Sequence, residues 1–191
     1  MGIAADGLHG QRCIYNSTFH KLRHDSIEQL LHSTIVGGVG RAYRQPRNLP
    51  CAGRLIPDLV IYLDNKTFLC DVTVTDTLAD TNLAAAARRP GQLAKEAARR
   101  KEEKYRLVTE AMDAVHLPFA VETMGGLSET AQQLIREIHH SASTHCTWRD
   151  ANAIGTHLVD SIAIAVQRCT GMGLQASMER EMRVAMGAQA V

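Results

Sequence analysis

The chain has 191 residues, 45% of them hydrophobic and 21% charged, which is the composition of an ordinary globular protein with one well-formed core. No apolar run approaches the length of a membrane span, so we expect no membrane partner. The net charge is only +1, and the five scattered cysteines form no Cys-x-x-Cys pair, which argues for a reducing compartment and against a disulfide framework.

The first half of the chain predicts a helix, a loop and a β-hairpin. Apolar residues recur at helical spacing over residues 17–35, and a glycine-rich run ends this helix. Two prolines and four arginines over residues 41–54 predict a loop. Residues 59–63 and 67–75 are rich in strand-forming side chains, and the Asp-Asn pair between them predicts a hairpin turn.

The second half predicts further helices and one strand. In chain order these are a connection or short helix over 79–90, an amphipathic helix over 92–115, a strand over 117–123, a helix from Ser128 to about 140, and two helices over 148–169 and 175–186. This order predicts an α/β fold with a short mixed sheet flanked by helices. We expect the core over residues 17–140, an N-terminal extension over 1–16 and a helical appendage over 141–191.

Charge is segregated along the chain. Residues 1–57 and 88–106 carry an excess of lysine and arginine, whereas residues 58–87 and 107–191 carry an excess of acids. An acidic centre between two basic stretches suits a metal site that holds a polyanion. Solvated helix faces are the alternative explanation of the same charge runs.

Two aspartates stand on the predicted hairpin. Asp58 begins the first strand after Pro57, and twelve residues separate it from Asp71 on the second strand. Counting outward from the turn, the two acids come out almost opposite each other. Asp71 has apolar neighbours, where an acid is costly unless it is paired or binds a cation. Two converging carboxylates suit Mg²⁺, although a turn cap at Asp58 and an arginine partner for Asp71 would fit the same spacing.

The helix predicted over 92–115 carries lysines on its apolar face. Lys101 and Lys104 fall inside the apolar stripe, and Tyr105 follows Lys101 by one turn on the same edge. A lysine on a core face needs an anionic partner, and the aspartate pair is the nearest one. Alternatively, both lysines extend past the helix edge into solvent. The stripe consists of Leu93, Ala97, Val108, Ala111, Met112 and Val115.

Four short motifs occur in order along residues 19–140. They are Arg23-His24-Asp25, Pro57-Asp58, Asp71-Val72-Thr73-Val74 and Lys101-Glu102-Glu103-Lys104-Tyr105. With these motifs the segment resembles the restriction-like endonuclease domain of site-specific non-LTR retrotransposons, within the PD-(D/E)xK nuclease superfamily. The resemblance implies a restriction-endonuclease-like core.

The resemblance also implies roles for individual residues. Asp58 and Asp71 would hold Mg²⁺ or Mn²⁺, and Lys101, with Tyr105 as its companion, would orient the nucleophile or screen transition-state charge. The wider superfamily has a lysine where this chain has Thr73, so the lysine would come from the helix instead.

Further candidate residues lie on the first helix and in the basic stretches. Glu28 is a candidate metal ligand, and by the resemblance Arg23 and His24 would lie near the DNA backbone. We also expect phosphate contacts from the predicted loop and the long helix, through Arg41, Arg44, Arg47, Arg54, Arg99, Arg100 and Lys104.

The family that the chain resembles carries a zinc knuckle just before this domain. Here only Cys13, His20 and His24 are available as ligands, so residues 1–16 would hold a remnant of the knuckle at most. We therefore expect no zinc in this chain.

The function implied by the resemblance is a Mg²⁺-dependent endonuclease that nicks target-site DNA to prime reverse transcription. Its partners would be double-stranded DNA and the upstream reverse transcriptase domain of the same polyprotein, in the nucleus. One alternative is a catalytically inactive DNA-binding or assembly domain of the same fold. Another is a stand-alone repair or resolvase-like nuclease.

Overall fold

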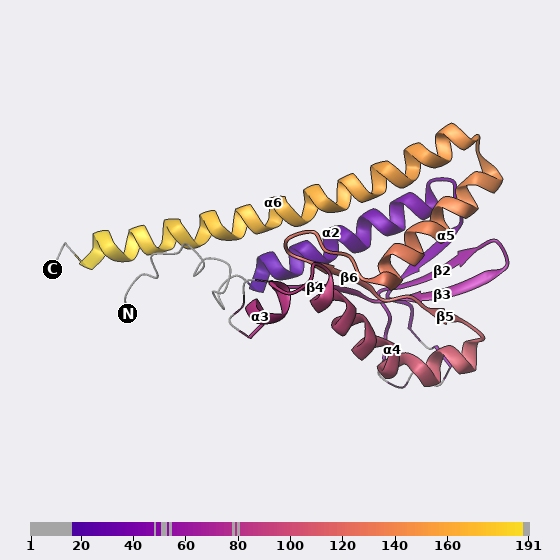
Figure 1. Ribbon diagram of the computed structural model, residues 1–191, viewed down its shortest axis with the longest axis horizontal. Helices are drawn as coiled ribbons and strands as arrows, with labels where there is room; N and C mark the ends of the chain where they lie inside the picture. Colours follow the sequence, from indigo (N-terminus) through magenta and orange to yellow (C-terminus); the bar gives the residue numbers. More distant parts are fainter. Residues whose placement is uncertain are drawn as a thin grey trace.

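Helices enclose a short sheet on both faces, and a long C-terminal helix runs along the outside (Figure 1). The computed structural model describes residues 17–47, 49–50, 53, 55–77, 79 and 81–188. Helices α2 (Ser17–Val36) and α5 (Glu129–His145) cover one face of the sheet, and α4 (Gln92–Met112) covers the other. The mixed α/β fold with a short mixed sheet flanked by helices is therefore confirmed.

The sheet is built around the predicted hairpin. Strands β2 (Leu59–Leu63) and β3 (Lys66–Cys70) pair antiparallel across a turn in which Asp64 takes a left-handed conformation, with a φ of 50°. The predicted second strand is interrupted at Asp71 and resumes as β4 (Val72–Thr75). Two short strands are added beyond the hairpin. Strand β5 (Val115–His116) pairs parallel with β3 in a four-stranded sheet, whereas β6 (Phe119–Glu122) pairs parallel with β4 in a two-stranded sheet.

Strand β1 (Arg41–Arg44) lies in the segment that was predicted as a loop, so that prediction was wrong for these four residues. The strand forms because it pairs antiparallel with β2 along its whole length. The first proline of the segment, Pro46, comes after the strand ends, so it removes no hydrogen bond from the pairing. Strand pairing over such a distance leaves little trace in local sequence.

The predicted helices are present, with different ends. Helix α4 ends at Met112 because Asp113 turns left-handed, with a φ of 47°, and the chain then enters β5 rather than continuing to residue 115 as predicted. The connection before α4 contains the short helix α3 (Leu83–Ala86). Helix α5 starts where it was predicted, with Ser128 as its N-cap, whose hydroxyl accepts a hydrogen bond from Ala131 N at 3.0 Å.

The C-terminal region forms one helix, α6 (Trp148–Ala188), rather than the two that were predicted. The helix continues through Gly171 and Gly173 because residues on both sides of them, Cys169 and Ser177, are buried. Packing along α2 thus outweighs the cost of about 1 kcal/mol for each helical glycine (Figure 1). Within the described residues, no helix is both long and apolar enough to cross a membrane.

The core has two parts, one on each face of the sheet. On the α2 side, side chains from α2, α5 and the first half of α6 meet alternate residues of β2 and β3. On the α4 side, Val60 and Leu69 meet Tyr105 and Val108 of α4. Asp58, just before β2, and Asp71, just after β3, therefore lie where side chains from both α2 and α4 can contact them.

The start of α4 is fixed by a buried acid that the sequence did not reveal. Glu122 on β6 is 3% exposed, and its carboxylate accepts hydrogen bonds from the backbone N–H groups of Gly91 and Leu93, both at 3.0 Å. Gly126 leaves room for this carboxylate, since a Cβ at that position would collide with it. The acid satisfies donors that a helix start leaves without partners.

Replacing Glu122 with alanine should lower the free energy of unfolding by about 2–4 kcal/mol, because buried N–H groups lose a charged acceptor. Urea unfolding followed by circular dichroism measures the change. Glu110→Ala is the matched control, since Glu110 makes only an exposed pair with Arg106 and its loss should change little. Equal stabilities of the Glu122 and Glu110 variants would contradict this account.

Candidate active site

Asp58 and Asp71 face each other across the hairpin, as their spacing predicted. Leu59 pairs with Cys70, so the next pair outward from the turn is Asp58 with Asp71. Asp71 stands at the interruption between β3 and β4, where its carbonyl accepts a hydrogen bond from Phe119 N at 2.8 Å. It is 4% exposed, so its carboxylate is almost removed from water.

Lys101 of α4 reaches this acid. Its Nζ donates to Asp71 Oδ1 at 2.9 Å, and its side chain is 28% exposed. Lys101 lies on the buried face of α4, one turn from Ala97 and one turn from Tyr105, so its side chain points to the sheet. Lys104 is exposed, with its Nζ 5.4 Å from the centroid of the Tyr105 ring. The predicted choice of Lys101 over Lys104 therefore agrees with the geometry.

Asp71 also has an oxygen without a partner. Oδ2 is buried and accepts no hydrogen bond from the part of the chain that the structure describes. An ionised carboxylate oxygen in such a place is costly unless a donor or a cation reaches it. The geometry therefore leaves Asp71 with one oxygen held by Lys101 and the other free for a further ligand.

Asp58 is held from a different side, by α2. Its Oδ2 accepts hydrogen bonds from Val72 N at 2.7 Å and from His24 Nε2 at 3.0 Å, while His24 Nδ1 lies 3.1 Å from Asp25 Oδ1. Burial opposes ionisation of Asp58, but the bonds from His24 and Val72 outweigh it and lower its pKa. The bond to Asp58 raises the pKa of His24 to about 9, so at neutral pH both of its ring nitrogens donate.

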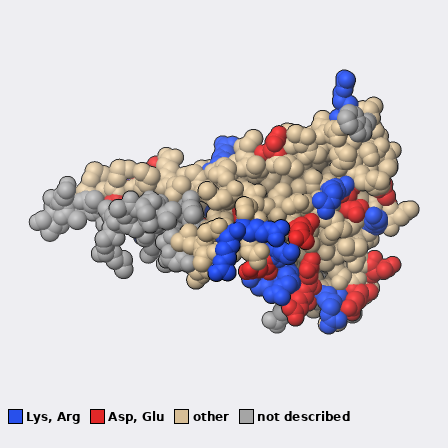
Figure 2. Space-filling view, viewed as in Figure 1, with Lys and Arg blue, Asp and Glu red and all other residues tan. Residues whose placement is uncertain are grey.

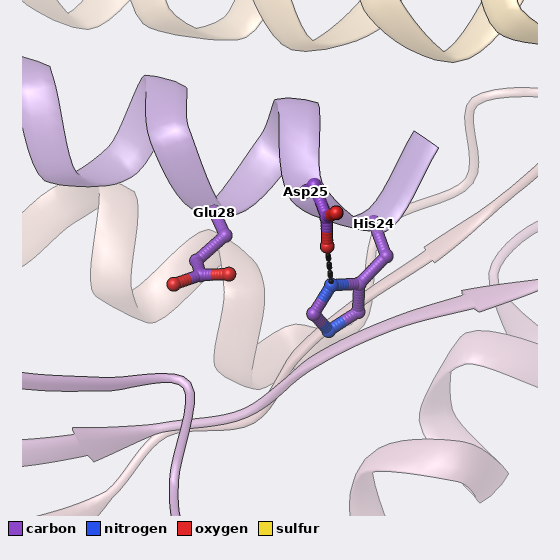
Figure 3. Close-up of side chains that lie close together, drawn as sticks. All are labelled: His24, Asp25 and Glu28. Carbon is purple, nitrogen blue, oxygen red and sulfur yellow. Dashed lines mark hydrogen bonds and ion pairs between the residues drawn. The ribbon is translucent and has the colours of Figure 1, made fainter. Parts of the chain in front are cut away.

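Glu28 lies one turn after His24 on the same face of α2 and is completely buried (Figure 3). Its Oε1 accepts a hydrogen bond from Arg44 Nε at 2.8 Å, and its Oε2 is buried without a partner among the described residues. Ligand atoms of His24, Asp25 and Glu28 lie within 4.8 Å of one another, the spacing of a candidate metal site. The α2 side thus adds acids and a histidine to the aspartate pair.

Tyr105 holds the backbone that leads into Asp58. Its hydroxyl donates to Ile56 O at 3.0 Å, close before Asp58 in the chain. Burial and the neighbouring Asp71 carboxylate raise the pKa of Tyr105, so the phenol stays protonated. Its ring packs against His116, with centroids 4.8 Å apart. Burial, and then the charge of Lys101, lower the pKa of His116 to about 4, so this imidazole is neutral near pH 7.

The low pKa of His116 predicts a loss of stability in mild acid. Between its unfolded pKa of 6.5 and its folded pKa of about 4, the unfolded chain binds a proton that the folded chain does not. Stability should therefore fall by about 2 kcal/mol between pH 7 and pH 5 from this group alone. Urea unfolding at both pH values should show a smaller fall in His116→Phe, which keeps a ring against Tyr105.

His157→Gln is the control for this measurement, because His157 is exposed on α6 and its replacement should leave the pH dependence as in the wild type. A His116→Phe variant that loses as much stability in acid as the wild type would show that His116 is already charged in the folded protein.

The structure places the other predicted residues in different surroundings. Arg23 is 6% exposed, so it does not lie at a surface where a phosphate could reach it, against expectation. His24 lies within the acidic site, and Arg44 is bonded to Glu28 and, at 2.7 Å, to Gln29. Arg44 is exposed despite these bonds, and the other exposed predicted contacts are Arg41, Arg47, Arg99, Arg100 and Lys104. Arg54, and Cys13 with the rest of residues 1–16, lie outside the described residues.

Basic side chains gather over α3 and the start of α4, with acidic side chains between them (Figure 2). Arg99 and Arg100 belong to α4, whereas Arg41 and Arg47 lie on and just after β1. The predicted phosphate contacts therefore come from two separate elements of the fold.

Sequence reasoning missed two contacts within the site. The bond from His24 to Asp58 joins residues 34 positions apart, and the one available signal was the position of His24 beside an acid on the first helix. The bond from Arg44 to Glu28 depends on β1, which was not predicted.

In comparisons with known proteins, no family model and no curated protein matches this chain.

Proposed function

We propose that this chain is a metal-dependent DNA endonuclease whose active site is formed by Asp58, Asp71 and Lys101. One observation carries the proposal. Lys101 is bonded to one oxygen of a buried acid that stands opposite a second acid, while the other oxygen of the buried acid has no partner among the described residues. Charged groups that converge in this way around a buried acid favour a functional site over a structural one.

The donor set fits Mg²⁺ or Mn²⁺. Asp71 Oδ2 is a buried anionic oxygen without a partner, and both bonds to Asp58 fall on Oδ2, so Asp58 can offer Oδ1. Hard divalent cations take such oxygen ligands. Glu28 Oε2 on α2 is a third candidate oxygen. When bound, the metal would supply an activated water and would neutralise charge on the attacked phosphate.

The chain's own residues would orient the carboxylates and offset the negative charge that develops on the phosphate. Lys101, held against Asp71, places a positive charge where charge develops on the phosphate. His24 and Val72 N fix one oxygen of Asp58, so this carboxylate keeps a single orientation. Tyr105 fixes the backbone at Ile56, just ahead of Asp58. These contacts would preorganise the acids before substrate arrives.

The finer assignment rests on the resemblance described above. The four motifs and the short mixed sheet flanked by helices support a restriction-endonuclease-like core. On this basis the substrate would be target-site DNA, nicked to prime reverse transcription in the nucleus by a chain that also carries a reverse transcriptase. Exposed Arg41, Arg47, Arg99 and Arg100 would contact its phosphates.

A non-catalytic domain of the same fold is the second candidate. It is favoured by the observation that each acid already has a cationic partner, Lys101 for Asp71 and His24 for Asp58. Such pairs can stabilise a DNA-binding scaffold without catalysis. The two candidates differ in whether the acids are needed for phosphodiester cleavage, whereas a stand-alone nuclease would share the chemistry of the first.

A plasmid-nicking assay tests the proposal. Purified protein is incubated with supercoiled DNA in Mg²⁺, in Mn²⁺ and in EDTA, and the relaxed circle is measured on a gel. We expect nicking with either metal and none in EDTA. Nicking that persists in EDTA would remove the metal dependence. DNA binding without any nicking in Mg²⁺ or Mn²⁺ would remove the endonuclease and favour the second candidate.

A further inference from the structure

Two tyrosines and an arginine form a cluster across β1 and β2, and the proposed function assigns no role to the two rings. The rings of Tyr43 on β1 and Tyr62 on β2 meet edge to face, with centroids 5.9 Å apart and planes at 83°. The guanidinium of Arg41 lies 5.8 Å from the centroid of the Tyr62 ring. Tyr43 is 53% exposed, so about half of this large side chain remains in water.

The cluster lies on the same face of the sheet as the catalytic candidates. Tyr43 pairs with Val60 and Arg41 pairs with Tyr62, and residues paired in antiparallel strands share a face. Val60 belongs to the core cluster of Tyr105, and Tyr62 packs partly against it. This is the face that α4, with Lys101, covers near Asp71.

Tyr43 is also near the acids along the strand. Gln45 N donates to Asp58 O at 2.8 Å, and Tyr43 pairs with Val60, which is two residues after Asp58 along the chain. Two strand residues span about 7 Å, which is about two base steps of a DNA strand. A nucleotide at Tyr43 would therefore lie one or two positions from a phosphate held at Asp58 and Asp71.

The chemistry of the cluster favours a nucleobase. A half-exposed tyrosine ring whose other side rests on a second ring is a rigid, flat surface for stacking, and Arg41 adds a cation that complements a phosphate. In a fully paired duplex the faces of the bases are covered by their neighbours. An unpaired base has a free face.

We propose that Tyr43, backed by Tyr62 and Arg41, stacks on an unpaired base next to the phosphate that is cleaved at the aspartate pair. This rests on the proposed function and specifies its substrate, which is DNA with unpaired nucleotides beside the cleavage position rather than continuous duplex. Stacking holds the strand by a base without reading its identity, so it adds affinity without sequence specificity.

DNA binding without cleavage tests the inference separately from catalysis. In EDTA, the affinity of the full chain is measured by fluorescence anisotropy for a single strand, for the paired duplex and for that duplex with an unpaired bubble. A 2-aminopurine in the single strand and in the bubble reports stacking by its quenching. The variants are Tyr43→Ala, Tyr43→Phe and, as a control, Ile164→Ala, which removes a residue of similar exposure from α6.

We expect Tyr43→Ala to weaken binding of the single strand and the bubble about tenfold or more and to remove the quenching. Tyr43→Phe and Ile164→Ala should behave as the wild type, and binding of the paired duplex should change little. Unchanged affinity and quenching in Tyr43→Ala would overturn the inference. The inference would also be overturned if Tyr43→Ala weakened binding of all three DNAs equally and Tyr43→Phe weakened it as much. That pattern indicates that the Tyr43 hydroxyl contacts a phosphate and that the ring does not stack on a base.

The nicking assay separates the two proposals. A protein that nicks plasmid DNA but shows no ring-dependent stacking keeps the proposed function and loses this inference. A protein that stacks the base on Tyr43 but never nicks keeps the inference as a DNA-binding property and loses the catalytic assignment.

Discussion

Replacing Asp71 with asparagine should reduce Mg²⁺-dependent nicking by about a thousandfold or more. The change keeps the size of the side chain but removes the anionic oxygen that is buried without a partner and the charge that holds Lys101 at 2.9 Å. The measurement is the initial rate of relaxed-circle formation at saturating Mg²⁺. Asp58→Asn should show a loss of the same order, since the two acids stand opposite each other.

The matched control is Asp160→Asn, which removes an exposed acid from α6, far along the chain from the aspartate pair. Its nicking rate should equal that of the wild type. Thermal unfolding without metal should show that Asp71→Asn is folded, because Lys101 is partly exposed and can turn to water once its partner is neutral. A folded Asp71→Asn protein that nicks at the wild-type rate would refute the assignment of the site.

Replacing Lys101 with methionine should slow nicking by about a hundredfold to a thousandfold while leaving DNA affinity nearly unchanged. Methionine keeps the packing of the side chain on α4, so the variant removes mainly the positive charge beside Asp71. A group that acts on transition-state charge contributes to the rate of cleavage more than to binding of the ground state. Single-turnover nicking rates and anisotropy affinities measured on the same DNA separate the two effects.

Lys104→Met is the matched control, since Lys104 is exposed three residues later and makes no contact with the acids. Its nicking rate should stay near that of the wild type. If the two variants lost activity equally, the effect would come from the total charge of α4 and not from the contact between Lys101 and Asp71. If neither lost activity, the ion pair would be structural, and the non-catalytic candidate would be the better explanation.

Local sequence patterns determined the first helix, the hairpin and the approximate place of the acids. Helical spacing of apolar residues and a two-residue turn depend only on neighbours in the chain, so α2 and the β2–β3 hairpin followed from them. Once the turn was placed, the period of a strand put Asp58 opposite Asp71. The helical period likewise put Lys101 on the buried face of α4.

Contacts between distant segments were decided only by the tertiary structure. Strand β1 exists because β2 pairs with it, and α6 is continuous because α2 supports it across two glycines. His24 reaches Asp58, and Arg44 reaches Glu28, because α2 packs on one face of the sheet. Each of these interactions joins groups whose local sequence is compatible with other conformations. The interaction energy that selects one of these conformations arises only when the distant segments meet in the folded chain. The sequence alone therefore determined the acid pair and its lysine, whereas the tertiary structure decided which residues surround them.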